Sequence, residues 1–288
     1  MALTTTVGGV WALQALLGIE TMPYALRLKP FVPSAHASLM VKSTAGDVHL
    51  TKTAEYLSLM AAGAIDQRGN VDEAVRDWMT VIGRPERQVI LAIRRPDDTA
   101  SADPGAQPTV RERVMVVCRR QRWLAMIARD ENDMVIDAVG ESTDPATQIE
   151  LICHTLLPAL GDAPAADIEG VNLPVDTLIT TLTASAPHGR AAMTAALARL
   201  GLGPQQVDVV TAAARLDESA MGVISVVDQG IKPVFHPQVV TVADTDFGRI
   251  SVTTTVGADG RKWMSIWPAS HAALREDVGA LLAAPRAA

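Results

Sequence analysis

The feature that most constrains the fold is an order of apolar patterns that occurs twice along the chain. The first set consists of four segments with the apolar period of two expected of strands and one segment with helical spacing, at 88–94, 113–118, 123–129, 134–139 and 145–160. The second set has the same order, at 222–228, 238–244, 249–256, 262–267 and 270–282. Matching segments are offset by about 125 to 134 residues. The sequence therefore predicts a single domain, 1–288, built from pseudo-repeat halves at about 1–165 and 166–288.

The connections between the strand segments are short, which predicts antiparallel hairpins. Arg-Arg-Gln-Arg at 119–122 and Asp-Glu-Asn-Asp at 130–133 are two of them. Helical spacing precedes the strands in each half, at 8–18, 50–65, 71–82, 175–182, 193–200 and 204–216. We expect an α+β fold: a pseudo-twofold duplicated unit with a central, mainly antiparallel β-sheet flanked by two α-helical bundles. The alternating segment YALRLKPFVP, at 24–33, predicts a further strand.

Two of the five tryptophans, Trp263 and Trp267, lie in the last strand segment. On a strand they share one face with Ser265, and Met264 and Ile266 share the other. We expect the tryptophans to pack in the core against the closing helix, which begins at Ser270, rather than to form a platform for a ligand.

Composition narrows the class of protein. The chain is 48% hydrophobic and 20% charged, which is typical of a folded globular protein, and its net charge of −7 argues against a general nucleic-acid binder. Cys118 and Cys153 lie in apolar segments and are expected to be buried in a reducing compartment. No basic residue precedes Arg27, and no apolar run approaches the roughly 20 residues that span a membrane. The sequence thus predicts a cytoplasmic protein without a membrane segment.

No motif in the sequence carries catalytic or metal chemistry. The six histidines stand singly, without a partner at metal-ligand spacing, and neither a nucleophile elbow nor a phosphate-binding loop is found. We therefore expect no enzyme, no metal and no cofactor. An enzyme whose residues converge from distant positions stays open as an alternative.

Seven arginines gather at the ends of the predicted hairpins, close to Trp123. They are Arg94, Arg95, Arg111, Arg113, Arg119, Arg120 and Arg122. This basic cluster, Arg94–Arg122, supports an alternative function as a nucleic-acid-binding adaptor. A charged rim around a protein-binding face accounts for the same residues, and the nearby Asp97, Asp98 and Glu112 balance part of the charge.

Two segments carry a resemblance to a known family. The opening GGVWALQALLGIETMPYALRLKP and the closing WMSIWPASHAALREDVGALL resemble the EspG family, the mycobacterial chaperones associated with ESX (type VII) secretion. The stretch LQALLGIETMPYALRLKP is most similar to the branch that serves the third ESX system. The resemblance implies a cytosolic chaperone that binds PE–PPE heterodimers by direct contact with the PPE subunit. It would cover the apolar tip of the PPE protein and keep it soluble and competent for secretion, without nucleic acid or membrane, and it could self-associate when empty.

The resemblance also points to a partner-binding surface. In this family the surface involves the sheet, the long loop after its first inner strand and the C-terminal helical half. Here the long connection is 95–112, which is rich in Pro, Asp and Ser and has no apolar period, so it is either functional or mobile. The candidates are Arg94, Arg95, Asp97, Asp98, Thr109, Arg111, Arg113, Ser219, Met221, Gln229 and Lys232. Variation in such a loop would suit discrimination between PPE partners.

Overall fold

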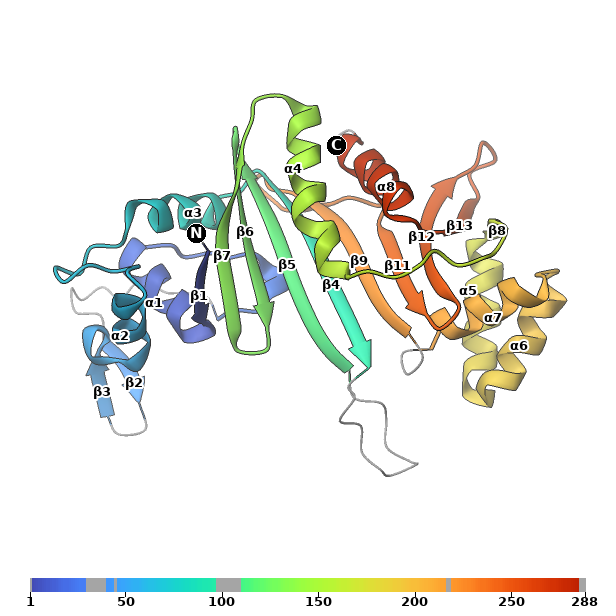
Figure 1. Cartoon of the computed structure of the whole chain (residues 1–288), viewed down its shortest axis with the longest axis horizontal. Helices are drawn as coiled ribbons and strands as arrows, with labels where there is room; N and C mark the ends of the chain where they lie inside the picture. The colour runs from blue at the N-terminus through green and yellow to red at the C-terminus, as the bar shows by residue number, and fades with distance from the viewer. Residues whose placement is uncertain (1, 30–39, 44–45, 97–109, 216–218, 285–288) are drawn as a thin grey trace. The chain divides into compact units, whose positions relative to one another are not determined.

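The computed structural model describes residues 2–29, 40–43, 46–96, 110–215 and 219–284 (Figure 1). Contacts divide the chain into two compact units. The first unit comprises Met1–Ile90, Arg113–Ile152 and Val227–Val234, and the second comprises Leu91–Glu112, Cys153–Val226 and Phe235–Ala288. Each unit combines helices with antiparallel strands. The predicted α+β class is therefore confirmed, while the single domain and the halves at about 1–165 and 166–288 stay predictions.

The strands form one large sheet, in which the predicted antiparallel hairpins are found. The strands are β1 (Leu3–Thr6), β4 (Arg87–Pro96), β5 (Val110–Arg120), β6 (Trp123–Asp130), β7 (Asp133–Glu141), β8 (Val171–Pro174), β9 (Ser219–Asp228), β10 (Val234–Phe235), β11 (Val240–Thr245), β12 (Gly248–Val256) and β13 (Lys262–Pro268). Their order is β1-β7-β6-β5-β4-β9-β11-β12-β13-β8, and β10 pairs with β9. At one edge of the sheet, the four-residue strand β1 leads directly into a helix and pairs with β7. At the other edge, the four-residue strand β8 also leads directly into a helix, and it pairs with β13. This correspondence is the pseudo-twofold arrangement that the repeated pattern predicts.

Three helices of the first unit are α1 (Val7–Leu17), α2 (Ala54–Ala61) and α3 (Glu73–Gly83). The α1 helix ends at Gly18, whose φ of 64° lies in the left-handed region that favours glycine. The α3 helix begins after Asp72, whose side chain accepts hydrogen bonds from the amides of Ala74 and Val75. It packs against β6 and places Met79 and Ile82 in the core. This packing positions the α3 side chains that face the sheet.

Three sequence expectations in the first unit need correction. The strand predicted at 24–33 is instead a short 3-10 helix, Tyr24–Leu26, because Arg27 has a φ of 49° that interrupts an extended backbone; residues 30–33 lie outside the described ranges. The helix predicted at 50–65 is divided by Thr53, whose extended backbone ends one turn and caps α2. The helix predicted at 71–82 begins two residues later, at Glu73, because Asp72 is its cap residue.

A two-stranded β-ribbon and the remaining helices complete the elements. The ribbon pairs β2 (Met40–Ser43) with β3 (Gly46–His49), and the helices are α4 (Pro145–Leu156), α5 (Val175–Ser185), α6 (Gly189–Arg199), α7 (Pro204–Ala213) and α8 (His271–Ala283). In the second unit, α5, α6 and α7 form a helical bundle (Figure 1). Leu178, Met193 and Leu197 from this bundle share a core with Ile250 and Ile266 from β12 and β13. The α8 helix begins after Ser270, whose hydroxyl accepts a hydrogen bond from the amide of Ala273, as the sequence predicts.

The tryptophan-bearing strand β13 turns its other face to this core. Ile266 is 2% exposed and Met264 packs against the same cluster, whereas Trp267 is 49% exposed. The Trp267 ring lies against the backbone of Gly170, where a Cβ atom would come within 2.2 Å of it. The prediction that Trp267 packs in the core is therefore wrong, because the helical bundle covers the Met264–Ile266 face.

Candidate partner-binding surface

In the second unit, two arginines that precede the long loop form hydrogen bonds with described residues. At the end of β4, Arg94 Nε donates to Glu112 Oε2 at 3.1 Å, and Arg95 Nη2 donates to the carbonyl oxygen of Leu160 at 3.2 Å. Arg111 is exposed at the start of β5. Asp97, Asp98 and Thr109 lie outside the described residues. The two ends of the loop are thus joined by an ion pair between β4 and β5.

The start of β9 lies close to the same place. Gly222 contacts Leu160, because a Cβ atom at that position would lie 2.6 Å from Leu160 Cδ2. Arg95 and the β9 segment around Met221, which is half-buried, therefore meet at Leu160. Ser219 is buried, and its hydroxyl donates to the carbonyl oxygen of Arg215 at 3.0 Å. Arg95 and β9 therefore both contact Leu160, but the Met221 side chain lies on the opposite face of β9 from position 222, so the structure shows no contact between Arg95 and Met221.

In the first unit, the candidates lie at two different ends. Arg113 Nε is 2.8 Å from Asp130 Oδ2 at one end of the β5–β6 hairpin. The amide of Gln229 donates to the carbonyl oxygen of Glu86, and the amide of Glu86 donates in turn to the carbonyl oxygen of Arg119. Gln229 thus lies at the Arg119 end of β5, about 20 Å along the strand from Arg113. The exposed Lys232 follows in the same connection as Gln229, so the structure does not bring these two together with Arg113.

The arginine cluster is divided rather than continuous. Four of its members face carboxylates, in the pairs Arg94–Glu112, Arg113–Asp130, Arg119–Glu86 and Arg122–Glu141. In the first unit, Arg113 and Arg122 also lie at opposite ends of the β5–β6 hairpin. A surface for a polyanion needs cations that stay available to phosphates along one face. This arrangement does not favour the nucleic-acid alternative.

Metal-binding clusters and membrane-spanning helices are absent from the described residues. Over residues 2–29, 40–43, 46–96, 110–215 and 219–284, no group of three or more His, Cys, Asp and Glu side chains could hold a metal ion. Within those same ranges, no helix is long and apolar enough to cross a membrane. Cys118 and Cys153 are both buried, and burial raises the pKa of the Cys118 thiol, so Cys118 is protonated and unreactive at neutral pH.

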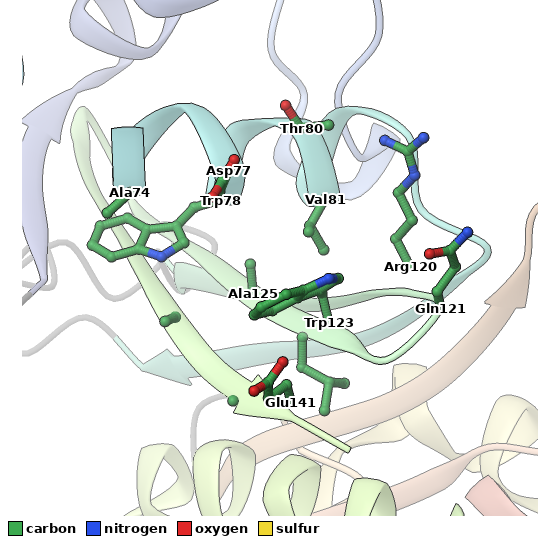
Figure 2. A pocket seen from close by; sticks show the side chains of 13 residues that line it. Ala74, Asp77, Trp78, Thr80, Val81, Arg120, Gln121, Trp123, Ala125 and Glu141 are labelled. Carbon is green, nitrogen blue, oxygen red and sulfur yellow. The ribbon is translucent and has the colours of Figure 1, made fainter. Parts of the chain in front are cut away.

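A cavity of about 520 Å³ in the first unit was not expected from the sequence (Figure 2). Trp78 on α3 and Trp123 at the start of β6 line it, and Val81 and Ala125 lie beside the Trp123 ring. The sequence pattern assigns Trp78 to the apolar stripe of its helix, but the residue is only half-buried. Trp78 differs from the buried residues of the stripe because it lies at the margin of the stripe, next to the exposed Asp77 and Glu73.

The family model of the EspG family matches residues 6–280 of the chain. The chain belongs to the EspG family. The ESX-2 secretion-associated protein EspG2 of Mycobacterium tuberculosis (strain CDC 1551 / Oshkosh) is 29% identical over 286 residues, which cover 96% of this chain and 91% of that protein. The ESX-5 secretion-associated protein EspG5 of Mycobacterium marinum (strain ATCC BAA-535 / M) is 26% identical over 282 residues, which cover 93% and 88%.

The fold of this EspG chain is similar to that of a solved relative. The structure of the Mycobacterium tuberculosis type VII secretion system chaperone EspG5 in complex with a PE25–PPE41 dimer matches with a TM-score of 0.74 at 22% identity, over 98% of this chain and 96% of that one. This likeness shows the fold. Because the relatives named here are ESX-2 and ESX-5 proteins, the branch that serves the third ESX system stays a prediction.

Proposed function

We propose that this EspG protein is a cytoplasmic chaperone, without enzymatic activity, that binds a PE–PPE heterodimer through its PPE subunit. It keeps the PPE protein soluble and competent for type VII secretion. The observation that carries the proposal is the match, over nearly the whole of both chains, to EspG5 in complex with a PE25–PPE41 dimer.

The exposed side chains of the β9–β10 connection support a role in binding apolar protein surface. Ile231 and Val234, both in the first unit, are exposed, and Lys232 is exposed between them. Apolar side chains surrounded by polar ones are typical of protein-binding faces, because the polar ones keep the empty face in water. Gln229 and Lys232, two of the candidates, belong to this connection.

The experiment is co-expression with each PE–PPE pair of the matching ESX system. Size-exclusion chromatography with light scattering should show a soluble complex with one copy of each of the three chains. The same measurement on the empty chain tests the predicted self-association. If every pair fails to form such a complex while the chaperone itself is folded, the proposal is wrong.

Charge and polarity variants locate the surface. Ile231→Ser with Lys232→Glu should weaken the PE–PPE complex by about tenfold or more, as expected for an exposed anchor residue and its charged neighbour. Leu57→Ser with Lys52→Glu is the matched control, since Leu57 and Lys52 are also exposed in the first unit but lie on α2 and the turn before it. An equal loss in both variants would remove the β9–β10 connection from the proposed surface.

A further inference from the structure

The cavity between α3 and the β5–β6 hairpin has an apolar centre with polar and charged residues at its margin. Its walls come from Trp78 and Val81 on α3, from Trp123, Leu124 and Ala125 on β6, and from Ala138 and Gly140 on β7. Its volume of about 520 Å³ is within the range of about 300–1,000 Å³ found for ligand sites. Trp123 is 46% exposed here, so a large aromatic surface faces solvent at the mouth of the cavity.

This cavity is one part of a longer groove. Trp78 and Ala74 also line a second cavity of about 350 Å³ that extends toward Leu3 and Ala64. Trp123 also lines a third cavity of about 590 Å³ that extends toward Gln148. The first two cavities share Ala74 and Trp78 of α3 and form one groove along this helix, which we call the α3 groove. No α3 residue lines the third cavity, so it lies outside the groove. The lining of the α3 groove reaches from Leu3 and Ala64 to Arg120, which fits an extended peptide segment.

The Trp123 ring is held in position by its neighbours. The guanidinium of Arg122 lies 4.8 Å from the ring centroid, and Arg122 Nε is 3.2 Å from Glu141 Oε2. Arg122 thus stacks on Trp123 while Glu141 holds Arg122. An indole fixed in this way loses little conformational entropy when a partner contacts it.

Two charged groups of the cavity are available to a partner. Asp77 and Arg120 line it on the two sides of Val81 (Figure 2). Neither side chain forms an ion pair or hydrogen bond with another described residue, whereas Arg119 and Arg122 beside Arg120 both face carboxylates. The groove therefore presents an anion and a cation on either side of an apolar centre. This pattern selects a segment with the opposite order of charges.

We propose that the α3 groove docks a segment of a second protein partner. The segment places an aromatic or large aliphatic side chain between Trp78 and Trp123, a basic side chain against Asp77 and an acidic side chain against Arg120. Arg120 and Trp123 lie about 23 Å along the β5–β6 hairpin from Arg113 and Asp130. The docking site is therefore distinct from the part of the predicted PE–PPE surface that contains Arg113, whereas Gln229 lies at the same end of β5 as Arg120.

A library of random twelve-residue peptides displayed on phage is the probe. Selection on the immobilised full-length protein, with counterselection on the Ala74→Trp variant, enriches peptides that need the open groove. Ala74 is exposed on α3, so a tryptophan there fills the groove without entering the core. We expect enriched peptides to carry an apolar or aromatic anchor between a basic and an acidic residue. Trp123→Ala should weaken the binding of a selected synthetic peptide by about tenfold or more.

A charge exchange gives the decisive measurement. In the double variant Asp77→Arg/Arg120→Asp, a peptide with its basic and acidic residues exchanged should bind more tightly than the original, by isothermal titration calorimetry. Enrichment of no peptide, peptides that bind Ala74→Trp equally well, or no reversal of preference in the double variant would each overturn the proposal. Thermal unfolding of each variant shows that the folded proteins are being compared.

The Ala74→Trp variant also distinguishes the α3 groove from the PE–PPE surface. Ala74→Trp should still form the PE–PPE complex, because Ala74 lines the α3 groove and none of the candidate PE–PPE residues does. If Ala74→Trp loses the PE–PPE complex, the groove belongs to that surface and the second-partner proposal is wrong. Failure of every PE–PPE pair with the unaltered protein would concern only the proposed function.

Discussion

Arg249 and Asp244 form a two-point ion pair across the β11–β12 hairpin. Arg249 Nε lies 2.5 Å from Asp244 Oδ1, and Arg249 Nη2 lies 2.8 Å from Asp244 Oδ2. The same Nη2 also donates to the carbonyl oxygens of Leu160, at 3.1 Å, and Gly161, at 2.9 Å. One buried guanidinium therefore fixes the segment that follows α4 to the hairpin of the second unit.

Replacing this guanidinium should be costly. Arg249→Met leaves a carboxylate and two carbonyl groups without their donor, and we expect a loss of about 3–5 kcal/mol in the free energy of unfolding. Urea denaturation followed by circular dichroism measures it. Arg261→Met is the control, because its pair with Asp259 is largely exposed, and such pairs contribute about 0–1 kcal/mol. Similar losses in the two variants would contradict a stabilising role for the Arg249 network.

Gly248 allows the same segment to approach β12. Its φ is 107°, and a Cβ atom there would lie 2.6 Å from the Cα atom of Ala166. Gly248→Ala should therefore lower the free energy of unfolding by more than the roughly 1–2 kcal/mol of an unfavourable backbone conformation alone. Gly260→Ala is the matched control: its φ is 77° and nothing lies within 4 Å of the added Cβ. Equal midpoints of thermal unfolding for the two variants would argue against the close approach at Ala166.

The two faces of β13 should differ in their contribution to stability. Ile266→Ala removes a side chain from the core of the second unit, and we expect a loss of about 2–5 kcal/mol. Trp267→Ala removes a larger but half-exposed side chain, and its loss should be smaller. Chemical denaturation of both variants decides between the faces. A greater loss for Trp267→Ala would restore the core role that the sequence pattern predicts for it.

The start of α4 predicts a dependence on pH. The hydroxyl and the amide of Thr147 donate to Asp144 Oδ2 at 2.7 Å and 2.9 Å, and these bonds lower the pKa of Asp144. A pKa lowered by folding stabilises the protein above the unfolded value, near 4, and this contribution is lost as pH falls through the folded pKa.

The difference in melting temperature between the unaltered protein and Asp144→Ala should therefore be constant from about pH 7 to pH 5 and shrink below about pH 4. Asp144→Asn is the control, because its amide oxygen caps the helix but does not titrate. Differential scanning calorimetry at several pH values provides the measurement. A difference that stays constant down to about pH 2 would rule out ionised Asp144 as the source of the cap.

The sequence predicts the long strands well, because a period of two is clear over eight or more residues, as in β6 and β12. It misses the edge strands β1 and β8, because four residues are too few for a period. Leu3–Thr6, for example, is one leucine followed by three threonines. The turn at Tyr24–Leu26 is missed because alternating side chains do not report the left-handed backbone of Arg27.

The candidate surface is harder to predict than the fold. Whether Gln229 lies near Arg113 or near Arg119 depends on which strands pair and in what register, and one sequence does not specify that. Trp78 and Trp123 line the same cavity only because α3 packs on β6. A helical stripe identifies an apolar face but does not show which of its marginal residues stay in contact with solvent.

The pairing of β1 has a consequence for the biosynthesis of the chain. Leu3 pairs with Ile136, and Thr6 pairs with Asp133, so β1 finds its partner only after more than a hundred further residues have been made. Until then the edge strand has no ladder to join, and closing so long a loop is slow. A nascent chain halted before Asp133 should therefore leave Leu3–Thr6 accessible to proteases, and protection of this segment would mark the pairing of β1 with β7.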